Sequence, residues 1–253
     1  MSKNSISFII MAAGNGSRMN SELPKVLHTI NNIPMIVHIL KTIINIPHDK
    51  IYIIFGKHIE KIKNTLIIYN LITYCDFVEQ KHPNGTGDAL KCCINELNNN
   101  NSKKIIVLNG DNPLIQENTL NSFINKSFNC HANIMTYMNN NPYGCGRIVI
   151  QNNKFYKIVE EKECYDNEKK IKLVNGGIYI FDRTILLNYL PKINNNNSTK
   201  EYYITDIFEL LIRDNKVVNT YKLNDNSYEL LGANTQSELK IIEKIYFEKI
   251  LNK

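Results

Sequence analysis

Several hallmarks of membrane, secreted and zinc-binding proteins are missing from this sequence. No apolar run approaches the ~18 residues that a membrane-spanning helix requires, and no small-residue cleavage site follows the N-terminus. We therefore expect neither a membrane association nor a signal peptide. The six cysteines form no Cys-x-x-Cys pair and no Cys/His spacing typical of zinc sites. This pattern favours reduced thiols, and hence a cytoplasmic protein.

The charge is moderately basic and is spread along the chain. The 30 Lys and Arg residues exceed the 24 Asp and Glu residues, which gives a net charge of +6. Such an excess suits a protein that handles phosphates, whereas nucleic-acid-binding proteins usually carry denser basic stripes. We therefore expect small phosphate-bearing substrates, and no nucleic acid, as partners. The sequence does not specify an oligomeric state.

Apolar segments of strand length alternate with segments of helical periodicity in the first half of the chain. We predict strands at 5–13, 51–55, 74–78 and 104–108, and helices at 34–44 and 86–97. This alternation is typical of an α/β protein with a mostly parallel sheet and helices on both faces. Ligands of such sheets bind beyond the carboxyl ends of the strands. The rule points to two loops, at 14–18 and at 109–111.

The second half is richer in strands and is not separated from the first by a linker. We predict strands near 133–138, 147–151, 155–160, 174–181 and 216–223, and helices near 203–213 and 235–251. No Pro-, Gly- or Ser-rich segment and no internal repeat divides the chain. We therefore expect a single domain over 1–253, with a nucleotide-binding lobe at about 1–110, a strand-rich acceptor lobe at about 111–230, and a C-terminal helix at 235–251.

The first loop, Ala12–Met19, combines glycines with cations. Glycines let backbone N–H groups approach a phosphate closely, Arg18 adds a rigid fork of donors, and Lys25 follows a stiffening proline. A dinucleotide fingerprint is excluded because Met19 replaces its third glycine, and a P-loop is excluded because Val26 follows the lysine. A simple strand-to-helix turn with a surface arginine explains the loop alone equally well. The joint presence of Arg18 and Lys25 favours phosphate binding.

An aspartate follows the apolar strand that ends near residue 108. Gly110 frees the chain, and Asp111 supplies the oxygen ligand that Mg²⁺ prefers. An aspartate that caps a helix or closes a turn is the more common case, so this residue alone does not establish a metal site. Asp88 and Asp206 resemble capping or surface acids.

In order and spacing, these segments resemble the N-acetylglucosamine-1-phosphate uridylyltransferase domain, the N-terminal half of bifunctional bacterial enzymes. The resemblance runs nearly from end to end, through the segments 11–19, 23–28, 85–87, 110–111, 143–148, 158–160, 175–178, 201–206 and 232–234. It implies a Rossmann-like nucleotidyltransferase fold. It also implies Mg²⁺-dependent formation of UDP-N-acetylglucosamine and pyrophosphate from UTP and a sugar 1-phosphate, N-acetylglucosamine 1-phosphate.

The resemblance also implies roles for individual residues. Arg18 and Lys25 match catalytic cations, and Asp111 and Asn234 match the pair that holds Mg²⁺. The residues that match nucleotide-binding positions are Ala12, Ala13, Gly14, Gly16, Gln80, Gly85 and Thr86. Gln80 corresponds to a uracil-reading glutamine, whose amide carries both a donor and an acceptor. The residues that match sugar-binding positions are Gly146, Glu160, Asn175 and Thr205.

Four features depart from the family pattern. Asn109 replaces a tyrosine, Gly176 replaces a threonine, and Asn15 replaces a lysine or a similar residue. These changes bear on nucleotide preference and rate, and leave the reaction class unaltered. The chain stops at Lys253 without hexapeptide repeats, so we expect neither the left-handed β-helix acetyltransferase domain nor the trimer built through it.

No Ser/His or Cys/His set suggests a covalent intermediate, so we expect direct in-line displacement. Three alternatives stay open. Another sugar 1-phosphate or base, such as glucose 1-phosphate or dTTP, fits the first loop as well. A catalytically inactive sugar-nucleotide-binding protein is disfavoured because Arg18, Lys25, Asp111 and Asn234 are all retained. A nucleic-acid-binding protein is supported by the net charge alone.

Overall fold

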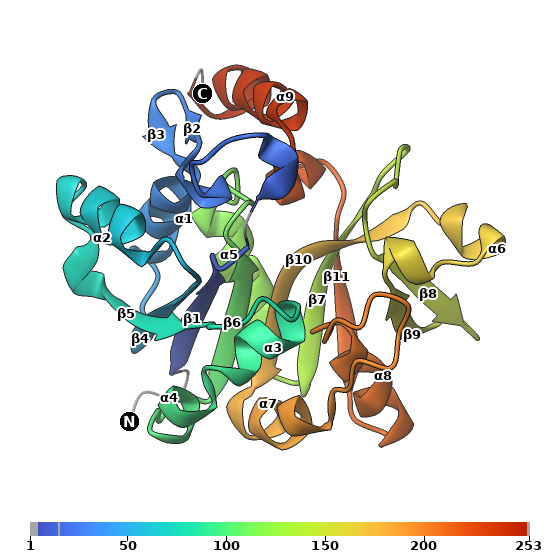
Figure 1. Ribbon diagram of the computed structural model, residues 1–253. Helices are drawn as coiled ribbons and strands as arrows, with labels where there is room; N and C mark the ends of the chain where they lie inside the picture. The colour runs from blue at the N-terminus through green and yellow to red at the C-terminus, as the bar shows by residue number, and fades with distance from the viewer. Residues whose placement is uncertain (1–4, 15, 252–253) are drawn as a thin grey trace.

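A nine-stranded sheet runs through the centre of the molecule (Figure 1). The structure is a computed structural model and describes residues 5–14 and 16–251. Four parallel neighbours form one half of the sheet, in the order β6 (Lys104–Asn109), β1 (Ile6–Met11), β4 (Lys50–Phe55) and β5 (Cys75–Glu79). The strands predicted in the first half of the chain are therefore confirmed, and every boundary lies within two residues of the prediction.

The other half of the sheet mixes strand directions. Strand β10 (Leu173–Asp182) is antiparallel to both β6 and β7 (Ala132–Met138), and β11 (Val218–Leu223) is parallel to β7 at the edge. The hairpin of β8 (Arg147–Gln151) and β9 (Lys154–Val159) joins β10 where Arg147 pairs with Val174. The predicted mixed, mostly parallel sheet is confirmed.

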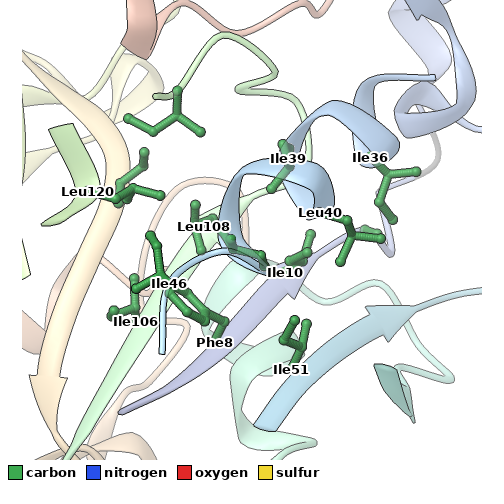
Figure 2. Close-up of a cluster of buried hydrophobic side chains, with 14 of the residues drawn as sticks. Phe8, Ile10, Ile36, Ile39, Leu40, Ile46, Ile51, Ile106, Leu108 and Leu120 are labelled. Carbon is green, nitrogen blue, oxygen red and sulfur yellow. The ribbon is translucent and has the colours of Figure 1, made fainter. Parts of the chain in front are cut away.

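Helices cover both faces of the sheet because the strands are apolar on both sides. In β1, Phe8 and Ile10 join one buried cluster and Ile9 joins the other. Figure 2 shows Phe8 and Ile10 packed with residues of β4, β6 and α1.

The helices that cover the first face of the sheet are α1 (Met35–Ile43), α2 (Ile59–Ile68) and α5 (Glu117–Lys126). Those of the second are α3 (Thr86–Lys91), α4 (Ile94–Asn98), α7 (Arg183–Tyr189) and α8 (Asp206–Arg213). The short helix α6 (Asp166–Lys169) follows the β8–β9 hairpin.

A third apolar cluster fastens the end of the chain to its beginning. Helix α9 (Gln236–Tyr246), which continues as a π-helical turn at Phe247–Leu251, buries Leu239 and Ile242 against Met19 and Ile30. It lies beside the small hairpin of β2 (Thr29–Ile30) and β3 (Ile33–Pro34) in Figure 1. Glu243 strengthens this contact by accepting the Asn31 backbone N–H at 2.8 Å.

Some predicted elements differ from the structure. The single helix predicted over 86–97 is wrong, because the chain tightens at Cys93, whose N–H bonds the Leu90 carbonyl three residues back, and α3 and α4 result. Helices α2, α5 and α7 were not predicted; α5 in particular carries few apolar residues. None of the described helices has the length and apolarity needed to cross a membrane.

We expect Ile10→Ala to lower the free energy of unfolding by about 2–5 kcal/mol, since this side chain is fully buried between β1 and the covering helices. Urea unfolding followed by circular dichroism measures the loss. Ile68→Ala is the matched control, because Ile68 is 75% exposed and its removal is expected to change stability by less than about 0.5 kcal/mol. Equal losses in both variants would contradict this account of the core.

Candidate functional site

The carboxyl ends of the parallel strands meet at one edge of the sheet, where both loops selected from the sequence lie. The first loop leaves β1 and is fastened to β4 by a hydrogen bond of 2.8 Å from the Ala12 N–H to the Ile54 carbonyl. The end of β6 closes against it, since the Gly110 N–H donates to the Met11 carbonyl at 3.0 Å. Ala12 is buried and Ala13 partly so, whereas Gly14 is exposed and faces open space. Asn15 lies outside the described residues.

Four side chains from distant segments form one cluster at this edge, which we call the cation cluster: Arg18, Lys25, Asp111 and Asn234. The Lys25 ammonium pairs with Asp111 Oδ2 and donates to Asn234 Oδ1 at 3.0 Å. Arg18 donates to the same Asn234 oxygen at 2.9 Å. Asp111 is only 8% exposed, so its carboxylate needs this cationic partner. The structure thus brings together all four residues to which the sequence analysis gave catalytic or metal-binding roles.

The backbone on either side of Lys25 positions its side chain in the cation cluster. Pro24 stiffens the approach, and Lys25 begins a short 3₁₀ turn at Lys25–Leu27. Gly16 has a φ of +60°, and a Cβ there would lie 2.8 Å from Lys25 Cβ. A residue with a side chain would therefore be strained at this position and would also push the lysine away.

Asn234 is positioned by the start of α9. Thr235 is the N-cap, and the Glu238 carboxylate reaches back to accept the N–H groups of Asn234 at 2.7 Å and Thr235 at 3.0 Å. The preceding residues are tied to the end of β6, because the Asp111 carbonyl accepts the Ala233 N–H at 3.2 Å. The buried amide of Asn112 adds a bond of 2.8 Å to the Leu230 carbonyl. These two hydrogen bonds hold the end of β6 and the segment before α9 against each other, although they are more than 100 residues apart in the chain.

A second group surrounds Gln80, directly after β5. The side chain is 6% exposed, and its Nε2 donates to the Gly85 carbonyl at 3.1 Å and to Asp88 Oδ2 at 2.8 Å. A uracil-reading glutamine, as the family resemblance implies at this position, offers a ligand both a donor and an acceptor. In the structure, both amide hydrogens of Gln80 are donated within the protein, so only the carbonyl oxygen Oε1 is available to a ligand.

The turn beside Gln80 is fastened to a segment of the second lobe. Gly85 has a φ of +111°, and a Cβ there would collide with the Tyr202 carbonyl oxygen, so glycine is required. The same oxygen accepts the Gly87 N–H at 2.7 Å. Thr86 Oγ1 accepts the Ile204 N–H at 3.0 Å. The predicted base-binding turn and the 202–205 segment therefore form one unit.

The four predicted sugar-binding residues also lie together. Thr205 Oγ1 donates to Glu160 Oε1 at 2.7 Å, and the Gly146 carbonyl accepts the Asn175 N–H at 2.9 Å. A Cβ at Gly146 would lie 3.4 Å from Asn175 Cβ and 3.6 Å from Glu160 Oε2. Burial raises the pKa of the Glu160 carboxyl, and the hydrogen bond from Thr205 opposes this shift. We call these four residues the acceptor group.

Two contacts join these groups across the sheet edge. The 202–205 segment connects the turn at Gly85 with Glu160, as described above. The Asn109 side chain lies directly against Gly177, which is two residues after Asn175 in strand β10. Asn109, which replaces the tyrosine of the family pattern, thus lies between the cation cluster and the acceptor group.

Asp88 and Asp206, for which the sequence suggested capping or surface roles, lie in the first turns of α3 and α8 and are partly buried. Asp88 is half-buried and bonds Gln80. Asp206 begins α8 beside Glu160, and burial together with the charges of Glu160, Glu209 and Glu163 raises its pKa to about 7. Asp206 also lines a hollow of about 420 Å³, together with Glu209 and Arg213, and no residue of the cation cluster lines it. The sequence alone did not indicate either environment, because the contact of Asp88 with Gln80 and that of Asp206 with Glu160 depend on how separate elements pack.

The oxygen donors Asp111 and Asn234 fit a divalent cation. Both oxygens reach one ammonium group, so they share a single cation position. A carboxylate and an amide oxygen are hard ligands, and Mg²⁺ commonly takes only one or two protein oxygens beside water and phosphate. Among the described residues, this site included, no set of three or more His, Cys, Asp or Glu side chains is arranged to hold a metal ion.

Comparisons with known proteins show the family to which the chain belongs. Residues 7–235 match the family described as nucleotidyl transferase. A probable UDP-N-acetylglucosamine pyrophosphorylase of Acanthamoeba polyphaga mimivirus is 39% identical over 241 residues, which cover 93% of this chain and 94% of that protein. The bifunctional protein GlmU of Campylobacter fetus is 37% identical over 251 residues, which are 98% of this chain but 55% of the relative. The chain thus spans little more than half the length of that bifunctional relative.

The solved structures support the fold. A putative glucose-1-phosphate thymidylyltransferase from Bacillus anthracis superposes with a TM-score of 0.74 at 22% identity, over 95% of both chains. The Rossmann-like nucleotidyltransferase fold expected from the sequence is confirmed.

The raised pKa of Asp206 predicts a pH-dependent gain in stability for Asp206→Asn. Between the unfolded pKa of 3.8 and the folded value of about 7, the unfolded chain gives up this proton more readily, so stability falls as pH rises. We expect the variant to be more stable than the parent by about 1 kcal/mol near pH ~8, and no more stable near pH ~4. Thermal unfolding at both pH values measures this difference. An equal shift at the two pH values would show that the carboxyl does not titrate in this range.

Proposed function

Because this chain belongs to the nucleotidyl transferase family, we propose that it transfers a uridylyl group from UTP to N-acetylglucosamine 1-phosphate. The products are UDP-N-acetylglucosamine and pyrophosphate. The cation cluster carries the proposal, because it gathers two cations and two metal-ligating oxygens beyond the carboxyl ends of β1 and β6. The relative from Acanthamoeba polyphaga mimivirus, which matches over nearly its whole length, supports the choice of substrates.

The reaction is an in-line displacement. A phosphate oxygen of the sugar 1-phosphate forms a bond to the α-phosphorus of UTP, and the bond from that phosphorus to the oxygen bridging to the β-phosphate breaks. Pyrophosphate leaves with the electron pair of that bond. Positioning and neutralisation of charge supply the catalysis in such transfers. Arg18 and Lys25 are the groups that stabilise the charge gathering on the pyrophosphate.

Asp111 and Asn234 would hold Mg²⁺, which, when bound, supplies positive charge to the reacting phosphates. Lys25 must leave these two oxygens before they can serve as ligands, and its ammonium is then available to the triphosphate. The lysine therefore keeps the Asp111 charge compensated in the free protein.

The base and the sugar are assigned to the remaining two groups. Gln80, Gly85 and Thr86 bind the uracil side of the nucleotide, and the acceptor group binds the amino sugar. The lobe boundary near residue 110 belongs to this proposal, since the nucleotide-binding residues precede it and the acceptor group follows it. We place the reaction in the cytoplasm; the six unpaired cysteines support that placement.

Pyrophosphate release in the presence of Mg²⁺ tests the proposal. UTP, dTTP, CTP and ATP are each combined with N-acetylglucosamine 1-phosphate and with glucose 1-phosphate. We expect the fastest release with UTP and N-acetylglucosamine 1-phosphate. A faster reaction with another pair would overturn the substrate assignment, and no release with any pair would overturn the activity.

Arg18→Ala is expected to lower kcat by ~10²–10³, the usual cost of one donor to a developing charge. The melting temperature should stay unchanged, because Arg18 is exposed. Steady-state rates and thermal unfolding measure the two effects. Arg213→Ala, which removes another exposed arginine, is the control and should leave both unchanged. Unchanged turnover in Arg18→Ala would refute the assignment of Arg18 to the phosphates.

Asp111→Asn is expected to weaken binding of Mn²⁺, used as a spectroscopic substitute for Mg²⁺, by about tenfold or more, because one ligand loses its charge. Electron paramagnetic resonance of free Mn²⁺ measures the dissociation constant without turnover. Asp76→Asn, at an exposed carboxylate paired with Lys50, is the control. If the dissociation constant stays at the parent value, the metal site lies elsewhere.

A further inference from the structure

The orientation of the Gln80 amide is fixed by its neighbours. Nε2 faces two acceptors, the Gly85 carbonyl at 3.1 Å and Asp88 Oδ2 at 2.8 Å. If the amide were turned over, its carbonyl oxygen would face both acceptors and two hydrogen bonds would be replaced by repulsion. The bond to Asp88 is made to a carboxylate, which makes it the stronger of the two.

Asp88 is held in place by its helix. It lies in the first turn of α3, three residues after Gly85, whose carbonyl also accepts the Ala89 N–H at 3.1 Å. The helix itself is fastened to the 202–204 segment through Gly87 and Thr86. The carboxylate therefore approaches Gln80 from a rigid element.

The opposite side of the amide remains available. Gln80 is 6% exposed, and within the described part of the chain no group donates a hydrogen bond to its Oε1. A buried amide thus retains one polar atom for a ligand, and this atom can only accept.

We infer that Asp88 is a positioning residue for base selection, which holds the Gln80 carbonyl oxygen toward ring N3 of the base and so favours a base that carries a hydrogen on N3. This inference rests on the proposed function, in which Gln80 meets the base. Uracil carries a hydrogen at ring N3 and can donate it to Gln80 Oε1. Cytosine carries a lone pair at N3, so two acceptors would face each other. Thymine has the same N3–H as uracil, so Asp88 does not separate these two.

Asp88→Ala tests the inference through ratios of kcat/KM, from which the folded fraction of the enzyme cancels. We expect the preference for UTP over CTP to fall about tenfold, because the amide loses its stronger restraint. The preference for UTP over dTTP should stay unchanged. Asp88→Asn should restore the UTP/CTP ratio, since the asparagine carbonyl can accept from Gln80 Nε2. Asp214→Ala removes an exposed carboxylate on another element and is the control.

Dissociation constants for UTP and CTP, measured by calorimetry on the same variants, separate this inference from the proposed reaction. If the parent protein binds UTP over CTP without turning it over, and Asp88→Ala loses that preference, the reaction is refuted and the role of Asp88 stands. If the parent transfers uridylyl groups selectively and Asp88→Ala keeps its UTP/CTP ratio, the role of Asp88 is refuted alone. A parent with no preference for UTP in binding or turnover overturns both.

Discussion

One ammonium group, that of Lys25, lies between oxygens from the middle and the end of the chain. The Asp111 carboxylate is mostly buried, and a buried charge without a partner costs several kcal/mol. Three segments must therefore meet: the loop after β1, the end of β6 and the start of α9. The arrangement at the sheet edge depends on this shared contact, because the Lys25 ammonium group has its hydrogen-bond acceptors on the other two segments, at Asp111 and Asn234.

Apolar burial and helix capping hold the distant end of the chain in this contact. Leu239 and Ile242 of α9 pack against Met19, at the end of the first loop, and against Ile30 of β2. The Thr235–Glu238 capping box then fixes the backbone at Asn234, directly before the helix. Helix α9 is thus a structural part of the site, since the same residues that bury its apolar face bring Asn234 to Lys25.

The features that could be predicted from the sequence are those that a short stretch of residues determines. Strand β6 follows from a continuous apolar run, and Asp111 follows from its place after that strand. Asn234 could be assigned only through the family resemblance, because it lies 209 residues from Lys25 and no local pattern marks a loop asparagine as a ligand. Asp88 and Asp206 lie in the first turns of their helices, but their contacts with other elements were not predicted. Their environment comes from Gln80 and Glu160, whose proximity only the folded chain reveals.

The role of a glutamine is also difficult to predict from the sequence, because its amide can both donate and accept hydrogen bonds. The fold removes one of these capacities at Gln80 by placing two acceptors on the same nitrogen. The remaining oxygen has a fixed direction before any ligand arrives, so binding need not pay for orienting it. In the proposed function, selectivity for the base therefore derives less from Gln80 than from the Asp88 carboxylate behind it, and the helix that carries Asp88 is hydrogen-bonded to the 202–204 segment.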